Sequence, residues 1–289
     1  ARILVEIVAA VRNVIGNRLA LGVRLCGDEF IDGGTTIDEA VEVAKIVEAT
    51  GQVDYINTSI GVATASLFMI EASMHIPPGY AMFIPAAIRK AVDLPVVGVG
   101  RFKDPLQAER ALAEGQCDLV GIVRGQIADA DFAIKARAGA TDEIRLCLSC
   151  NQECVGRMGL NRWLGCIENP RTGRENEWRV DNHLAITSKP KKVMIAGAGP
   201  AGLQAAIAAA RKGHQVTVYE KEPVAGGQVR IAASVPNRAE FGDMIRNQLA
   251  ECNRLGVSFV YGSGVWPGLV EETKPDHVIV ATGAEPSRP

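Results

Sequence analysis

The chain has 289 residues, of which 47% are hydrophobic and 22% are charged, which suits two globular domains with full cores. Its formal net charge is −2 at pH 7, so no basic field favours nucleic acid or an anionic membrane as a partner. No run of about 18 apolar residues exists, and the sequence therefore predicts no membrane-spanning helix. No signal peptide is visible, and the cysteine pattern indicates a reducing, cytoplasmic location.

Residues 1–146 alternate short apolar segments with helical patterns. After an amphipathic pattern at 1–15, we expect strands at 19–25, 53–59, 94–100 and 117–123, and helices at 36–50, 83–92 and 104–115. The strand segments are continuous apolar runs, which is typical of parallel strands buried on both faces. Four such units predict an α/β fold, the C-terminal half of a TIM (β/α)8 barrel. Half a barrel leaves open sheet edges, so we expect a fragment of a longer enzyme.

Two loops that contain glycine and arginine follow the last two predicted strands of this part. Gly98, Gly100 and Arg101 follow the first of these strands, and Gly121 and Arg124 follow the second. In complete barrels the last two strand–helix loops commonly bind a phosphate, and two arginines can clamp it with forked hydrogen bonds. The alternative is that the glycines ease packing and that the arginines are surface charges.

Residues 147–190 are expected to form a cysteine loop followed by a polar linker. The loop contains C-x2-C-x3-C-x11-C, formed by Cys147, Cys150, Cys154 and Cys166. Three close thiols and one distant thiol are typical of a chain that wraps a 4Fe-4S cluster. A structural zinc ion is the competing interpretation, although a second CxxC hairpin or a nearby His is lacking, and the thiols could also be unliganded. The other cysteines lie in apolar runs and are expected in the core: Cys26, Cys117 and Cys252.

Residues 191–289 are expected to form a Rossmann-like dinucleotide-binding domain. Gly197, Gly199 and Gly202 form GxGxxG directly after a predicted strand and at the start of a helix. Gly197 permits the tight turn, Gly199 lets the backbone approach a pyrophosphate, and Gly202 lets helix and strand pack closely. The helix N-terminus offers N–H groups to phosphates. Glu220 ends the next strand and is placed to accept hydrogen bonds from a ribose.

The remainder of this domain bears on which dinucleotide it binds. A second glycine pair, which includes Gly227, follows Glu220, and we expect a helix at 239–256 and a strand at 277–283. The glycine pair and the late ATG at 281–283 resemble the FAD domain of disulfide-reductase-like flavoproteins. This resemblance implies FAD rather than NAD, with a domain that holds only ADP as a further alternative.

Barrel loops, cysteine loop and dinucleotide domain, in this order, resemble the iron–sulfur branch of the old yellow enzyme family over nearly the whole chain. Its members include 2,4-dienoyl-CoA reductase, 2-enoate reductase, and trimethylamine and histamine dehydrogenases. The cysteine spacing is similar to that of the dienoyl-CoA reductases, whereas GVGRF with its following DP is more similar to the amine dehydrogenases. Residues 71–92 resemble a subgroup associated with mycofactocin gene clusters.

The resemblance implies roles for individual residues. Arg24 matches the arginine that stabilises negative charge at the flavin pyrimidine, and Arg101 and Arg124 match ligands of the FMN phosphate. The four cysteines of the loop match the cluster ligands. The glycines of the GxGxxG turn, together with Glu220, match the FAD site.

One position departs from the family pattern. Ala63 takes the place of the proton-donating His of the dienoyl-CoA reductases. Nearby Thr64 and Ser66 have the wrong pKa for a general acid. His75 could supply the proton, or it could be a satisfied loop histidine. The sequence therefore leaves the catalytic residues unassigned.

The sequence predicts a flavin and iron–sulfur oxidoreductase that acts on a small molecule. As a reductase it would take electrons from NAD(P)H through FAD, the cluster and FMN to an activated C=C bond of an enoate or dienoyl-CoA. As an amine or N-methyl dehydrogenase it would pass electrons outward, to an electron-transfer protein. A third interpretation is a non-catalytic electron-transfer module or an inactive fragment. Substrate, nicotinamide preference and oligomeric state do not follow from the sequence.

Overall fold

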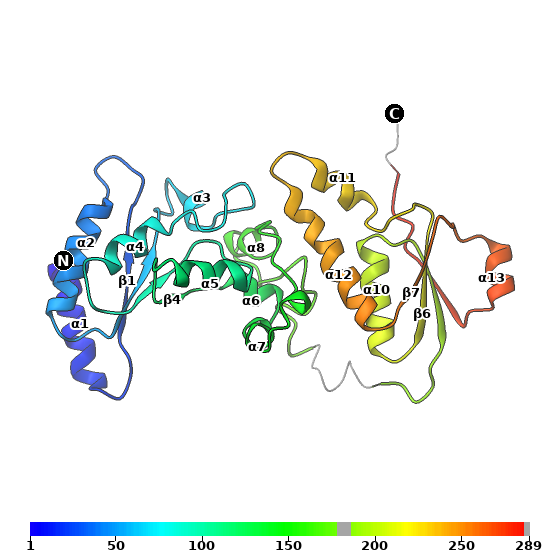
Figure 1. The fold of residues 1–289 in the computed structure, drawn as a ribbon, viewed down its shortest axis with the longest axis horizontal. Helices are drawn as coiled ribbons and strands as arrows, with labels where there is room; N and C mark the ends of the chain where they lie inside the picture. Colours follow the sequence, from blue (N-terminus) through cyan, green and yellow to red (C-terminus); the bar gives the residue numbers. More distant parts are fainter. Residues whose placement is uncertain (178–185, 286–289) are drawn as a thin grey trace. The chain divides into compact units, whose positions relative to one another are not determined.

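The computed structural model describes residues 1–177 and 186–285, and the chain divides into two compact units, Ala1–Gln126 and Ile127–Pro289 (Figure 1). Each unit is an α/β structure built on a four-stranded parallel sheet, which confirms the predicted fold class. Within the described ranges, no helix is both long enough and apolar enough to cross a membrane.

The first unit pairs its strands in chain order. The strands are β1 (Gly22–Cys26), β2 (Tyr55–Ser59), β3 (Val96–Gly98) and β4 (Leu119–Val120). The helices are α1 (Arg2–Ile15), α2 (Ile37–Ala49), α3 (Leu67–Ile70), α4 (Phe83–Arg89), α5 (Pro105–Ala113) and α6 (Arg124–Ala128), the last of which spans the division between the units. The predicted strand at 94–100 ends early because the carbonyl of Gly100 accepts a hydrogen bond from the N–H of Gly79, at 2.7 Å, instead of pairing in the sheet.

The core of the first unit lies between the sheet and its covering helices. On β1, Val23 and Leu25 are buried, whereas Arg24 between them is exposed on the opposite face of the sheet. This alternation follows from the two-residue period of a strand. Fully buried Ile56 of β2 and Val47 of α2 belong to the same cluster. Helix α2 is capped by Thr36, whose N–H donates to the Glu39 carboxylate at 2.9 Å, in a capping box.

The second unit begins with short elements that lead into the cysteine loop: α7 (Phe132–Arg137), a 3₁₀ turn η1 (Thr141–Glu143) and α8 (Val155–Gly159). Buried Asp129 organises the start of this segment. Its carboxylate pairs with Lys135 at 2.6 Å and accepts the backbone N–H of Arg145 at 2.9 Å. The chain is therefore fixed by a buried ion pair just before the first cysteine.

The remainder of the second unit is a doubly wound domain with strand order β7-β6-β5-β8. Its elements are β5 (Lys192–Ala196), α10 (Pro200–Arg211), β6 (Gln215–Glu220), α11 (Gln228–Ser234), η2 (Ala239–Phe241), α12 (Gly242–Arg254), β7 (Ser258–Tyr261), α13 (Pro267–Thr273) and β8 (His277–Val280). Figure 1 shows α10 and α12 side by side against one face of this sheet, and α13 on the other. The strand order reverses at β5, which is where such folds bind ligands.

Gly202 is required by packing between the glycine-rich turn and α10. A Cβ on Gly202 would lie 1.9 Å from the carbonyl oxygen of Gly197, which is backbone and cannot swing away. We expect Gly202→Ala to destabilise the second unit by about 1–3 kcal/mol, because overpacking outweighs the gain in helix propensity of roughly 1 kcal/mol.

The matched control is Gly199→Ala, because a Cβ on Gly199 would meet nothing within 4 Å. Urea unfolding followed by circular dichroism measures the free energy of unfolding of both variants. Gly199→Ala should stay within about 0.5 kcal/mol of the wild type. Equal stability of the two variants would show that the close approach at Gly202 does not matter.

Candidate cofactor sites

Three segments of the second unit that are far apart in sequence meet beyond the carboxyl end of β5. Gly197 has a φ angle of 106°, and a Cβ there would lie 2.4 Å from the carbonyl oxygen of Ala281, so this turn requires glycine. The N–H of Gly226 donates to the carbonyl of Ala198 at 2.9 Å. The GxGxxG turn, the second glycine pair and the late ATG are therefore assembled at one place.

Open space lies beside Gly199, the N-cap of α10. Gly227, with a φ angle of 50°, approaches it so closely that a Cβ would lie 3.4 Å from the Cα of Gly199. The start of α10 thus presents backbone N–H groups next to a position without a side chain. This arrangement can accept an anionic group such as a pyrophosphate.

Glu220 takes part in the shape of this turn. Its side chain is buried, and Oε2 accepts the N–H of Ala198 at 2.7 Å, while Oε1 accepts the N–H of Glu222 at 3.0 Å. A carboxylate oxygen has two lone-pair positions, so each oxygen can still accept one more hydrogen bond. A contact between Glu220 and a ribose stays a prediction.

The glycines of the first unit are explained by packing within the protein. A Cβ on Gly98 would lie 2.8 Å from the methyl group of Met82, and one on Gly121 would lie 2.8 Å from a valine methyl group. Gly100 approaches the backbone of Gly79, with 3.3 Å left for a Cβ. The packing interpretation therefore accounts for all three glycines, and phosphate binding by these loops stays a prediction.

Arg101 and Arg124 gather near a tyrosine that the sequence did not single out. Arg101 is only 9% exposed and has a φ angle of 60°, so it is a buried cation rather than a surface charge. The hydroxyl of Tyr80 donates to a backbone carbonyl. Burial raises the pKa of Tyr80, and the positive charges of Arg124 and Arg101 lower it. Only the preceding Pro-Pro-Gly turn marks Tyr80 in the sequence.

Three further residues that the sequence analysis considered are exposed: Arg24, Ala63 and His75. Arg24 is exposed on β1, and its Nη1 donates to Oδ1 of Asn57 on the neighbouring strand at 3.1 Å. His75 and Ala63 are exposed in the segments around α3. Ser66 is buried and its hydroxyl donates to a backbone carbonyl, which is a structural role.

The four cysteines of the loop influence one another electrostatically. Burial raises the pKa of Cys150, and charge on Cys147 or Cys154 would raise it further. Burial raises the pKa of Cys166 to about 11, where charge on Cys147 acts in the same direction. Within residues 1–177 and 186–285, however, no three Cys, His, Asp or Glu side chains are grouped closely enough to hold a single metal ion.

Backbone N–H groups point at the sulfur atoms of this loop. Ser149 and Asn151 adopt φ angles of 52° and 58°, and the N–H of Ser149 donates to Sγ of Cys147 at 3.3 Å. Against the larger effect of burial, N–H groups of Asn169 and Glu168 lower the pKa of Cys166. The left-handed residues thus turn the chain so that its donors face sulfur.

The fourth cysteine returns to the first three through contacts across α8. Glu153 and Gly165 each lie next to a cysteine of the loop, and the N–H of Gly165 donates to the carbonyl of Glu153 at 2.9 Å. The side chain of Glu153 also forms an ion pair with Arg157 of α8. This return explains how a cysteine distant in sequence can join the others.

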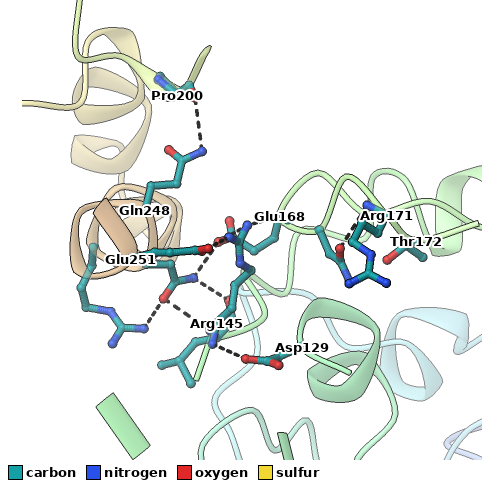
Figure 2. A network of polar contacts seen from close by, with 12 residues as sticks. Asp129, Arg145, Glu168, Arg171, Thr172, Pro200, Gln248 and Glu251 are labelled. Atoms are coloured by element: carbon teal, nitrogen blue, oxygen red, sulfur yellow. Dashed lines mark hydrogen bonds and ion pairs between the residues drawn. The ribbon is translucent and has the colours of Figure 1, made fainter. Parts of the chain in front are cut away.

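A buried polar network joins the cysteine loop to α12 (Figure 2). The guanidinium group of Arg145 donates to the backbone carbonyl of Glu168 and pairs with the carboxylate of Glu251. Nδ2 of Asn247 donates to Oε1 of Glu168 at 2.8 Å. Burial raises the pKa of Glu168 to about 7, although Arg145 and Asn247 lower it. The sequence analysis missed this network. The signal that could have indicated it is the set of polar residues on the buried face of α12.

The three cysteines predicted to be core residues differ in burial. Cys117 and Cys252 are buried as predicted, whereas Cys26 is only half-buried, which corrects the expectation for that residue. The thiol of Cys26 lies 3.4 Å from the carbonyl of Asp28 and 3.5 Å from that of Gly61, so it sits at the strand end rather than in the core.

Comparison with protein families agrees with this architecture. Residues 1–143 match the NADH:flavin oxidoreductase / NADH oxidase family, and residues 191–289 match the pyridine nucleotide-disulphide oxidoreductase family. The two parts of the chain thus match two families of oxidoreductases. The first domain of the chain belongs to the NADH:flavin oxidoreductase / NADH oxidase family, and its second domain is of the pyridine nucleotide-disulphide oxidoreductase type.

Individual relatives confirm the resemblance inferred from the motifs. The chain is 38% identical to an NADH oxidase of Thermoanaerobacter brockii, over 98% of this chain and 43% of the relative. It is 35% identical to an N,N-dimethylglycine/sarcosine dehydrogenase of Chromohalobacter salexigens, over 97% and 41%. A solved 2-naphthoyl-CoA reductase, in complex with 2-naphthoyl-CoA, matches with a TM-score of 0.92 and 32% identity, over 100% of this chain and 43% of that one. The chain thus spans about two fifths of these relatives.

The pKa of Cys252 allows a test of how well the hydrophobic core of the second unit is packed. Burial raises it from 9.0 to about 12, so the thiol stays protonated in the folded chain at pH 8. Because the thiolate is the nucleophile, we expect iodoacetamide at pH 8 to leave Cys252 unmodified until urea unfolds the chain. Mass spectrometry of the labelled peptides measures this. Rapid labelling in the folded chain would contradict it.

The same shift predicts a dependence of stability on pH. A folded-state pKa above the unfolded one means that the contribution of Cys252 is fully present below pH 9.0 and declines as the pH rises towards 12. The free energy of unfolding should therefore fall less steeply above pH 9.0 in Cys252→Ala than in the wild type.

Proposed function

We propose that the chain supplies residues to three redox centres of an NAD(P)H-dependent oxidoreductase: FMN, a 4Fe-4S cluster and FAD. The observation that carries this proposal is the cysteine loop, where N–H groups face sulfur atoms and the chain returns to bring the fourth thiol back. The loop lies between domains of two flavoprotein families, which supports a path for electrons between flavins.

The fit of the loop favours a cluster over a single ion. A tetrahedral zinc ion with Zn–S bonds of about 2.3 Å would hold its sulfur atoms close to one another, roughly 3.8 Å apart. The described thiols influence one another, and the spacing of three close thiols and one distant thiol supports a larger centre held by Cys147, Cys150, Cys154 and Cys166. N–H groups aimed at sulfur favour thiolate ligands and adjust the potential of the cluster. Such a cluster, when bound, supplies single-electron transfer.

The turn around Gly199 supports an FAD site. The start of α10 would bind the pyrophosphate through its N–H groups, while the gap at Gly199 lets the phosphates approach the backbone. Glu220 would accept from the ribose with its remaining lone pairs. The second glycine pair, assembled at the same turn through Gly226 and Gly227, supports FAD rather than NAD. A domain that holds only ADP is the alternative that nucleotide extraction would reveal.

For FMN, the chain offers two arginines and a third further along the sheet. Arg101, buried and near Tyr80, and Arg124, at the start of α6, would hold the phosphate with charge-assisted hydrogen bonds. Arg24 would stabilise negative charge on the pyrimidine. Bound flavins supply hydride transfer, while these residues bind and orient them.

The relatives support a substrate class. Likeness to a 2-naphthoyl-CoA reductase supports reduction of an activated C=C bond, of the enoate or dienoyl-CoA type. Ala63 at the proton-donor position, together with likeness to an N,N-dimethylglycine/sarcosine dehydrogenase, supports a second candidate, oxidation of an N-methylated amine with an electron-transfer protein as acceptor. In either direction the free thiols require a reducing compartment, which supports the cytoplasm.

Anaerobic purification with iron, sulfide and visible-absorbance assays tests the cluster. We expect about four irons and four sulfides per wild-type chain and a broad shoulder near ~400 nm. Cys150→Ser should lower both contents severely, because one corner of the cluster loses its thiolate. Cys26→Ser is the matched control, since Cys26 lies outside the loop and its neighbours can accept from a hydroxyl. Zinc without sulfide in the wild type would contradict the cluster proposal.

Gly199→Ala tests the dinucleotide site with the fold intact. A methyl group in the gap beside α10 should weaken FAD binding at least about tenfold, or 1.4 kcal/mol. The control is the free energy of unfolding, which should match that of the wild type because the Cβ meets no neighbour. Isothermal titration with FAD, and with ADP and NAD for comparison, measures the loss. Unchanged FAD affinity would show that the pyrophosphate does not approach Gly199.

A further inference from the structure

The two ends of the cysteine loop are bonded to the same residue of α12, and we call these two ends the neck. Leu146 directly precedes Cys147, and Glu168 follows shortly after Cys166. Both neck residues are bound by one side chain, that of Asn247 on α12. Oδ1 of Asn247 accepts the N–H of Leu146 at 3.4 Å, and its Nδ2 donates to the carbonyl of Leu146 at 3.1 Å and to Oε1 of Glu168 at 2.8 Å.

The hydrogen-bonding groups of the Asn247 side-chain amide are nearly all used. Asparagine has two N–H donors and one carbonyl oxygen, and at Asn247 both donors are engaged by the neck, while the oxygen accepts from Leu146 and also from Arg246 at 2.5 Å. Asn247 is only 5% exposed, so water does not compete freely for these groups. Arg145 adds a second tie, from the carbonyl of Glu168 to the carboxylate of Glu251, and Figure 2 shows Arg145 and Glu168 directed at the face of α12 that carries Gln248 and Glu251.

We propose that Asn247 is a positioning residue for the cysteine ligands, a role that rests on the proposed iron–sulfur function. By holding Leu146 and Glu168 together before any metal binds, it removes much of the entropy cost of bringing Cys166 back to Cys147. Its amide forms hydrogen bonds to both ends of the loop at once, as donor and as acceptor, which neither an apolar side chain nor a carboxylate can do.

The position of Asn247 also makes the cysteine loop depend on the dinucleotide domain. Asn247 lies on α12, and its neighbour Gln248 donates to the carbonyl of Pro200 at 3.2 Å, in the first turn of α10. The helix that holds the neck is therefore bonded to the helix whose N-terminus faces the proposed pyrophosphate site. The ligands are pre-arranged only when this domain is folded.

The test compares Asn247→Leu with Gln248→Leu in the anaerobically reconstituted 289-residue chain. Both residues are 5% exposed on the same helix, but only Asn247 contacts the neck, so Gln248→Leu matches the loss of buried polar contacts. One readout is the rate at which EDTA bleaches the cluster absorbance. The other is hydrogen–deuterium exchange of peptides covering 145–148 and 166–169 in the metal-free chain, which does not depend on a cluster.

We expect Asn247→Leu to lose the cluster on the order of tenfold faster than the wild type and to exchange faster at both neck peptides. Gln248→Leu should stay closer to the wild type than to Asn247→Leu in both readouts, because it weakens the bond from α12 to α10 without releasing the neck. Asn247→Asp keeps the shape and the acceptor but loses both donors. If the leucine variant unfolds, Asn247→Asp takes its place and should show the same faster loss of the cluster and faster exchange at both neck peptides.

Two outcomes would overturn the inference, and they differ from failure of the proposed function. Equal bleaching rates in the wild type, Asn247→Leu and Asn247→Asp would show that Asn247 does not position the ligands. Equal acceleration in the Asn247 and Gln248 variants would show a general effect of destabilising α12. A wild-type chain that takes up no iron and sulfide would instead remove the proposed function, whatever the exchange of the neck.

Discussion

Parallel pairing of strands is the constraint on which both units depend. Strands β1 to β4 pair in chain order, and β5 lies between β6 and β8. Parallel strands bring all their carboxyl ends to one edge, so the loops that follow them become neighbours however far apart they are in sequence. This places Gly197 against Ala281 in the second unit. Buried apolar strands thus fix loop positions before any ligand is considered.

Buried charged groups in the second unit hold the cysteine loop on helix α12. Arg145, itself partly buried, lies between the buried carboxylates of Glu168 and Glu251. Burying ions costs free energy that their mutual attraction repays only with good geometry, and removing one partner of such a group typically costs about 3–5 kcal/mol. The network therefore specifies which surfaces meet more than it adds stability. It fastens an irregular loop onto the regular helix α12.

Several residues chosen for chemistry turn out to serve packing as well. Gly98 and Gly121 are small because side chains crowd them, and the Ser66 hydroxyl accepts from the N–H of Val62 and donates to the carbonyl of Glu29. Glycine patterns alone could not separate these roles, since a close approach of protein backbone and a close approach of ligand favour the same residue. Arg101 is the opposite case: a cation taken as a possible surface charge is buried, near Tyr80.

The sequence by itself determined most of the strands, the longer helices and their class, but not β7, α11 or α13. Continuous apolar runs, a GxGxxG turn between strand and helix, and the spacing of four cysteines were enough for two α/β units and for family-level chemistry. These signals are local, because period, turn and spacing are set within a few residues. Only the tertiary structure decided that Asn247 and Arg145 hold the neck of the cysteine loop, and that Tyr80 joins two arginines. Such contacts join residues that no local pattern relates, and they arise only when folding brings distant segments into one buried, low-dielectric place.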